Sequence, residues 1–134
     1  MNDTLTIKDI APYIPYRLQI ETPLGIEQAK GIILNNFGNL VLHTNDWWSA
    51  NKIKPLLRPL SQLTEAITHH GKNFIPICWL EETYPTLNLH EQAHSLIEDS
   101  RWINQVNYLL ILHLLEWHYD INNLIQRKLA IEIK

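Results

Sequence analysis

KGIILNNFGNLVLHT, residues Lys30–Thr44, contains two apolar runs on either side of a turn. The linker Asn35–Asn39 is rich in residues that tolerate positive φ, and such residues favour a tight connection between strands. The two runs are therefore predicted to form a β-hairpin. Upstream, Tyr16–Thr22 alternates polar and apolar residues, as a half-buried strand does. The N-terminal third is thus expected to be a three-stranded meander.

Downstream of Asp46 the apolar residues recur at helical rather than strand spacing. Ser61 is expected to cap a first helix that ends at Gly71, and Asn88 is expected to cap a second. The segments predicted to be helical are Gln62–His69, Asn88 to about Glu98, and about Arg101 to Tyr119.

Two further segments complete the expected sheet. Phe74–Leu80, FIPICWL, is apolar but contains Pro76, which lacks a backbone donor, so this run is at best an edge strand. Leu129–Ile133, LAIEI, is expected to return to the sheet as a last strand. The predicted fold is a single α+β domain over residues 1–134. It combines a small, mostly antiparallel sheet, made of the N-terminal meander and the C-terminal strand, with a layer of helices.

Composition restricts the class of protein. The 134 residues are 46% hydrophobic, which suffices for a core, and the net charge of −3 argues against general or sequence-specific nucleic-acid binding. The single Cys78 fits a reducing compartment. The longest apolar run, Leu109–Leu115, is far shorter than the ~20 residues of a membrane span. The N-terminal MNDTLTIKD has no signal-peptide pattern. A cytoplasmic protein without a membrane partner is expected.

The predicted helix from Trp102 to Tyr119 is apolar on nearly every side. Such a helix is either buried at the centre of a fold or part of an interface between subunits. Because a chain this short can enclose few helices completely, a homo-oligomer is predicted.

One motif is typical of zinc sites. His90-Glu91-Gln92-Ala93-His94 matches HExxH, in which two imidazoles on one helical face share Zn²⁺ and the glutamate acts as general base. Glu116 and Asp120 match the third ligand and the orienting aspartate of the gluzincin arrangement. The alternative hypothesis is therefore a zinc peptidase with ligands His90, His94 and Glu116 and with Glu91 as base.

Several observations oppose this zinc hypothesis. Leu89, Ala93 and Leu96 form the core stripe of the same helix, which leaves the two histidines at its margin. Seven histidines in the chain also make a chance pair at this spacing more frequent. We therefore prefer the prediction that the protein has no catalytic residue and no metal cofactor.

Other residues are candidates for ligand binding without catalysis. An exposed tryptophan near a cation could stack a nucleobase while the cation binds a phosphate. Arg58 could clamp an anion or pair with Glu116, and Glu116, on an apolar helix, should be paired, with Arg127 as one alternative partner. The candidate ligand-binding residues are Trp47, Trp48, Arg17, Arg58, Glu116 and His118.

Five segments resemble parts of a known group of proteins: Lys8–Tyr16 (KDIAPYIPY), Lys54–Leu63 (KPLLRPLSQL), Lys72–Ile77 (KNFIPI), Leu114–Asp120 (LLEWHYD) and Leu124–Ile133 (LIQRKLAIEI). The chain thereby resembles short, uncharacterised proteins of phages and prophage-bearing bacterial genomes. The resemblance implies an accessory role such as anti-defence, either by occluding a host protein or by sequestering a small ligand such as a nucleotide. HEQAH is not part of the shared pattern. The leading hypothesis is a non-enzymatic binding protein.

Overall fold

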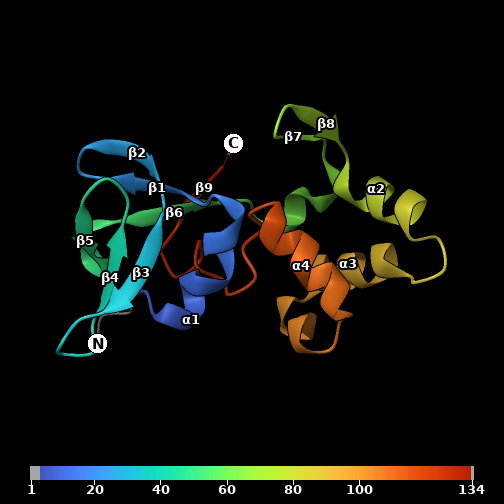
Figure 1. Ribbon diagram of the computed structural model, residues 1–134. Helices are drawn as coiled ribbons and strands as arrows, with labels where there is room; N and C mark the ends of the chain where they lie inside the picture. Colours follow the sequence, from blue (N-terminus) through green and yellow to red (C-terminus); the bar gives the residue numbers. More distant parts are fainter. Residues whose placement is uncertain (1–3, 134) are drawn as a thin grey trace. The chain divides into compact units, whose positions relative to one another are not determined.

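The computed structural model describes residues 4–133, and the chain divides into two compact units. Residues 4–57 and 122–133 form the first unit, and Arg58–Ile121 forms the second. Helices and mostly antiparallel strands are both present, which confirms the α+β class (Figure 1). The prediction of a single domain stays a prediction.

The first unit contains two sheets and short helical turns. The four-stranded sheet has the order β2 (Gly25–Gln28), β1 (Gln19–Thr22), β6 (Lys54–Leu57) and β9 (Ile131–Glu132). The three-stranded sheet has the order β3 (Gly31–Leu34), β4 (Leu40–His43) and β5 (Trp47–Ser49). The helical turns are α1 (Ile7–Ile10) and the 3₁₀ helices Ala11–Tyr16 and Ala50–Lys52. The expected C-terminal strand is confirmed as β9, which runs parallel to β6.

The hairpin predicted around Asn35–Asn39 is confirmed as β3 and β4. The Asn35 side-chain oxygen accepts hydrogen bonds from the backbone N–H groups of Phe37 and Asn39, at 2.9 and 3.0 Å. Gly38 has φ 76°, the left-handed conformation that glycine adopts at little cost. The local turn chemistry thus fixes this pairing.

The three-stranded meander is wrong in its pairing. β1 pairs with β2 and β6, whereas β3 and β4 pair with β5 in a separate sheet. A turn before β2 explains the difference, because the Thr22 hydroxyl accepts from the Leu24 N–H at 3.1 Å and donates to the Gly25 carbonyl at 3.0 Å. This turn lets the chain reverse at once and pair β1 with the unpredicted strand β2.

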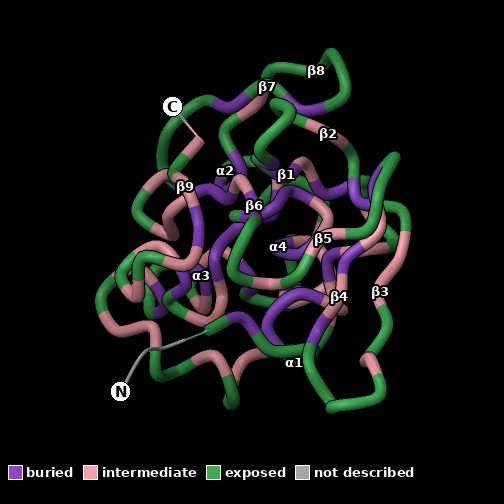
Figure 2. The backbone as a smooth tube through the Cα atoms, turned by 90° about the vertical axis from the view of Figure 1, so that its left-hand side faces the viewer, coloured by how far each residue is buried: buried purple, intermediate pink, exposed green. Residues whose placement is uncertain are grey.

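The second unit consists of a hairpin and three helices around an apolar core. Its elements are β7 (Ile67–His69), β8 (Lys72–Phe74), α2 (Pro76–Thr83), α3 (Leu89–Glu98), α4 (Tyr108–Glu116) and the 3₁₀ helices Leu60–Thr64 and Ser100–Asn104. Its buried core residues are Leu63, Ile67, Ile77, Leu80, Leu89, Ala93, Leu96, Leu110, Leu114, Trp117 and Tyr119. The first and last residues of β7 are buried, whereas the tip of the β7–β8 hairpin is exposed (Figure 2).

The helix predicted over Gln62–His69 is wrong, because its second half is strand β7. His70 and Gly71, at φ 50° and 78°, form the two-residue turn between β7 and β8. Positive φ at both central residues is the geometry that twisted hairpins favour. Gly71 therefore ends a strand rather than a helix.

Two other predicted elements also need correction. Phe74–Leu80 is not an edge strand, since α2 begins at Pro76, where the fixed φ of proline suits a first helical turn. The long helix expected from Arg101 to Tyr119 is interrupted. The Asn107 side-chain oxygen accepts a hydrogen bond from the Leu109 N–H at 2.8 Å and starts α4 there. The predicted helix beginning after Asn88 is confirmed as α3.

Helix α4 uses much of its apolar surface inside the second unit. Leu110, Leu114 and Leu115 are buried, whereas Tyr108 is exposed. In the described range 4–133, no helix combines the length and the hydrophobicity required to cross a bilayer. The homo-oligomer stays a prediction, and the apolar character of α4 is largely explained without it.

Candidate functional site

A pocket of about 500 Å³ lies in the second unit, where the β7–β8 hairpin meets residues of α2 and the end of α4. Its lining residues are His69, His70, Lys72, Asn73, Phe74, Trp79, Glu116 and Trp117, and we call it the histidine–aromatic pocket. Small-molecule sites usually measure roughly 300–1,000 Å³. The pocket therefore has the size of a site for a mononucleotide or a comparable metabolite.

Three aromatic rings form one wall of this pocket. The Trp117 ring lies 5.3 Å from the Phe74 ring and 5.2 Å from the Trp79 ring, centroid to centroid, at interplanar angles of 59° and 88°. Trp117 is buried, whereas Phe74 and Trp79 are only partly buried. Inclined rings at these distances attract one another. Trp117 thus supports Phe74 and Trp79, which remain accessible to a planar ligand.

The hairpin contributes the polar rim. Lys72 and Asn73 are exposed, and the Asn73 side-chain nitrogen donates a hydrogen bond to the Thr68 hydroxyl at 3.1 Å. The His70 ring meets the His69 ring edge-on, with centroids 4.0 Å apart. The rim therefore combines a mobile cation with hydrogen-bonding groups held by the hairpin turn.

His69 is the buried histidine of the pocket. Its ring lies against His70 and, at 5.3 Å between centroids, against His118. Burial is the main cause that lowers the pKa of His69 to about 4, and electrostatic repulsion from His70, His118 and Arg58 acts in the same direction. A hydrogen bond to the Glu116 backbone carbonyl acts in the opposite direction. His69 is accordingly neutral at pH 7.

The tautomer of His69 follows from its contacts. Nε2 is buried and has no hydrogen-bond partner among residues 4–133, so the nitrogen that donates to the Glu116 carbonyl is Nδ1. In a neutral imidazole the second nitrogen is then an acceptor. The positive charge at this pocket therefore comes from the rim and not from His69.

Glu116 places a carboxylate at the same pocket from the end of α4. Its side chain is 46% exposed, and its Oε2 lies 4.0 Å from His113 Nδ1. His113 Nε2 in turn lies 2.9 Å from the Tyr84 hydroxyl, and the His113 ring stacks on Trp117 at 5.2 Å. Burial lowers the pKa of His113, an effect that Glu116 opposes. The carboxylate is thus accessible to hydrogen-bond donors of a ligand.

The expected arginine partners of Glu116 bind elsewhere. Arg127 Nη1 lies 3.3 Å from Asp9 Oδ1 in the first unit. Arg58 is buried, and its Nε and Nη2 donate to the backbone carbonyls of Trp117 and Thr68, each at 3.1 Å. Burial lowers the pKa of Arg58, an effect that Tyr119 opposes. Arg58 thus fixes the backbone beside the pocket, and its guanidinium is not presented as an anion clamp.

The remaining predicted ligand contacts are also placed by the structure. Trp47 is exposed on β5 and stacks on His43 at 4.4 Å, and the Trp48 indole N–H donates to the Thr44 hydroxyl at 3.0 Å. Arg17, exposed with φ 58°, precedes β1. These three belong to the first unit, whereas His118 is buried behind His69 in the second.

The HEQAH motif lies in the first two turns of α3. Glu91 and His94 are exposed and His90 is partly buried, while Leu89 and Ala93 enter the core as the stripe predicted. Within residues 4–133 there is no group of three or more His, Cys, Asp or Glu side chains that could hold a metal ion. The structure does not bring His90, His94 and Glu116 together as ligands. Asp120 is buried, and its backbone N–H donates a hydrogen bond to the Arg58 carbonyl at 2.8 Å.

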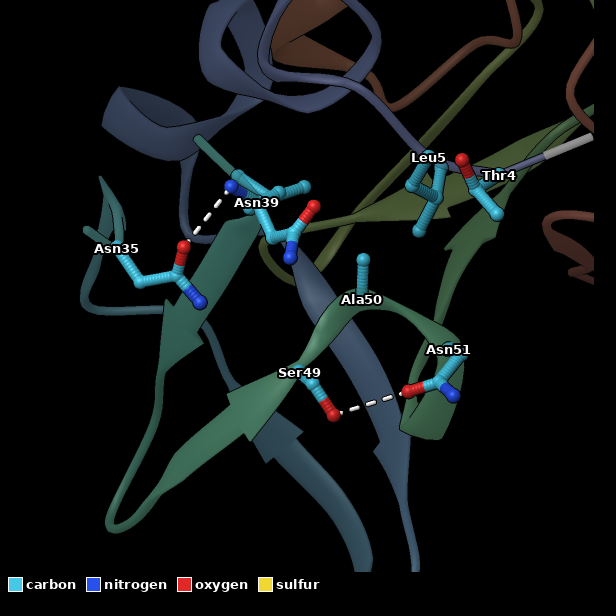
Figure 3. A pocket seen from close by; sticks show the side chains of 8 residues that line it. Thr4, Leu5, Asn35, Asn39, Ser49, Ala50 and Asn51 are labelled. Carbon is cyan, nitrogen blue, oxygen red and sulfur yellow. Dashed lines mark hydrogen bonds between the residues drawn. The ribbon is translucent and has the colours of Figure 1, made fainter. Parts of the chain in front are cut away.

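A second pocket, of about 370 Å³, lies in the first unit (Figure 3). Polar side chains in its lining are Thr4, Asn35, Asn39, Ser49 and Asn51. Two of these side chains hold loops, because Asn35 accepts from the Asn39 N–H and the Ser49 hydroxyl donates to Asn51 Oδ1 at 2.9 Å. Among residues 4–133, those that line this pocket include no charged side chain. It is therefore less suited to an ionic ligand than the histidine–aromatic pocket.

Of the candidates named from the sequence, Glu116 lines the histidine–aromatic pocket. His69, His70, Lys72 and Trp79 were missed, although the run HHGKN contains a His-Gly pair that could have been recognised as a hairpin turn bearing polar side chains.

No family model, no curated protein and no solved structure matches the chain significantly.

Proposed function

We propose that the protein is a non-enzymatic binding protein that sequesters a small, nucleotide-like ligand in the histidine–aromatic pocket. The observation that supports it is the combination, in one cavity of about 500 Å³, of the accessible rings Phe74 and Trp79 with the cation of Lys72. Nucleobases stack on aromatic side chains, and phosphates pair with lysine. Binding of this kind needs no cofactor.

The proposed biological role follows the resemblance to phage and prophage proteins. Such a protein would act in the cytoplasm of a bacterial or infected host cell, where removing a nucleotide signal from solution would serve anti-defence. The net charge of −3 supports a small ligand over a long nucleic acid, whose binding depends on many basic contacts.

Replacing Trp79 tests the proposed site. We expect Trp79→Ala to weaken binding of mononucleotides at least tenfold in calorimetric titrations, because stacking of one base contributes about 1–3 kcal/mol. Trp102→Ala is a matched control, since Trp102 is exposed on the 3₁₀ helix Ser100–Asn104 and does not line this pocket. Circular dichroism verifies that both variants fold. Equal affinities of wild type and a folded Trp79→Ala protein would reject the site.

A second candidate function is occlusion of a host protein. It is favoured by one face of the β3–β4–β5 sheet, on which Ile33, Val41 and Trp47 lie together according to the strand register. Ile33 and Trp47 are 48% and 56% exposed. Exposed apolar patches often mark protein-binding surfaces.

We propose the same face for the predicted homo-oligomer, because Leu110 and Leu114 of α4 are buried in the core of their own unit. We expect light scattering to give a dimer whose fraction rises with concentration. The double variant Ile33→Lys, Trp47→Ser should be monomeric, because a charge on the face opposes its burial. A wild-type protein that stays monomeric at every concentration would contradict the assignment.

A further inference from the structure

We infer that the ligand of the histidine–aromatic pocket is a guanine nucleotide. This inference rests on the proposed function and adds the identity of the base. It is carried by the kinds of hydrogen-bonding groups that line the pocket: a carboxylate beside the aromatic wall and a cation on the hairpin rim.

The carboxylate of Glu116 is the accessible group next to the rings. Its side chain is 46% exposed, and its Oε2 lies 4.0 Å from His113 Nδ1, too far for a hydrogen bond. Trp117, the residue that follows it, is part of the aromatic wall. A base stacked on Phe74 or Trp79 would therefore turn its edge towards an acceptor-only group.

An ionised carboxylate accepts two hydrogen bonds side by side, so it selects a base edge with two adjacent donors. Guanine has such an edge, formed by N1–H and the exocyclic N2 amine. Adenine and cytosine present one amine beside a ring-nitrogen acceptor, and uracil presents one N–H between two carbonyls. Glu116 therefore favours guanine over the other bases.

The phosphate end is provided by the hairpin. Lys72 is exposed and is the first residue of β8 after the His70-Gly71 turn. Its ammonium group is a flexible point charge of the kind that binds phosphate. His69 is buried and neutral, so it adds no second positive charge that would compete with Lys72 for the phosphate. A guanosine monophosphate would thus have its base at Glu116 and its phosphate at Lys72.

Calorimetric titration of the full-length protein with GMP, AMP, UMP and guanosine tests this inference. We expect GMP to bind at least tenfold more tightly than AMP or UMP, and guanosine to bind several-fold more weakly than GMP. Glu116→Gln should abolish or reverse the preference for GMP over AMP, because an amide presents one acceptor and one donor and matches adenine. Lys72→Met should remove the difference between GMP and guanosine. Lys52→Met, an exposed lysine of the first unit, is the matched control and should retain that difference.

The outcomes separate the inference from the proposed function. Equal affinities for GMP, AMP and UMP would overturn the guanine assignment and leave nucleotide sequestration standing. Absence of binding to all four compounds would overturn both. A folded Glu116→Gln protein, verified by thermal unfolding, that keeps the wild-type preference for GMP would also overturn the assignment, because the carboxylate would then not read the base.

Discussion

Acidification from pH 6.5 to pH 4 is expected to lower the free energy of unfolding by up to about 3 kcal/mol through His69. The unfolded chain has a histidine pKa near 6.5, whereas the folded protein holds the pKa of His69 at about 4. Between these values the unfolded chain binds a proton that the folded protein does not. The contribution of neutral, buried His69 to stability is therefore fully present above pH 6.5, and it is lost progressively as the pH falls towards 4.

Urea unfolding at several pH values between 4 and 7.5, followed by tryptophan fluorescence, measures this dependence. His69→Gln should have a shallower pH dependence than wild type, because the titrating group is gone while a polar side chain remains. His94→Gln, which removes an exposed histidine of α3, should have the wild-type dependence. Other groups, His113 among them, contribute equally to all three proteins and cancel in the comparison. Coincident pH profiles of wild type and His69→Gln would show that burial of His69 does not set the acid sensitivity.

The elements that could be predicted from the sequence are those whose own residues fix them. The turn at Asn35–Asn39 carries the hydrogen bonds that hold β3 to β4, and the apolar stripe Leu89, Ala93 and Leu96 defines α3. Both signals act within a few residues, so no knowledge of distant partners is needed.

Two kinds of element could not be predicted. In one kind the local sequence is compatible with two secondary structures, and in the other a strand pairs with a segment far away in the chain. The His70-Gly71 pair suits a helix end and a hairpin turn, and the pairing of β7 with β8 decides for the turn. Pro76 is disfavoured in a central strand but is compatible with the first turn of a helix. β1 pairs with β6, which follows it by more than thirty residues, and no local sequence pattern predicts this pairing.

The same distinction applies to the candidate site. Glu116 was recognisable because a carboxylate on an apolar helix is unusual wherever the helix lies. Lys72, Trp79 and His69 become site residues only because the hairpin and α2 meet the end of α4. Arg58 was recognisable as a charge among apolar residues, but its partners are backbone carbonyls, which a sequence does not display.

Arg58→Met is expected to lower the free energy of unfolding by about 2–3 kcal/mol. The substitution leaves the Trp117 and Thr68 carbonyls without the donors that they have at 3.1 Å. The bond to Trp117 is buried and the bond to Thr68 is part-buried, and an unpaired buried carbonyl costs about 1–3 kcal/mol. Part of this loss is offset, because the variant no longer desolvates a cation. The loss dominates because one substitution removes the donors of two carbonyls, one of which, that of Trp117, accepts a buried hydrogen bond.

Chemical unfolding of Arg58→Met, Arg58→Lys and Arg101→Met separates the contributions. Arg58→Lys keeps the charge but not the planar fork that reaches two carbonyls, so its stability should lie between wild type and Arg58→Met. Arg101→Met removes an exposed arginine that pairs with Asp99, and it should leave the stability close to that of wild type because solvent screens an exposed ion pair. Because Thr68 precedes His69 and Trp117 follows Glu116, nucleotide affinity should fall with stability in the Arg58 variants alone. An Arg58→Met protein as stable as wild type would mean that the cost of burying this cation equals the gain from its two hydrogen bonds.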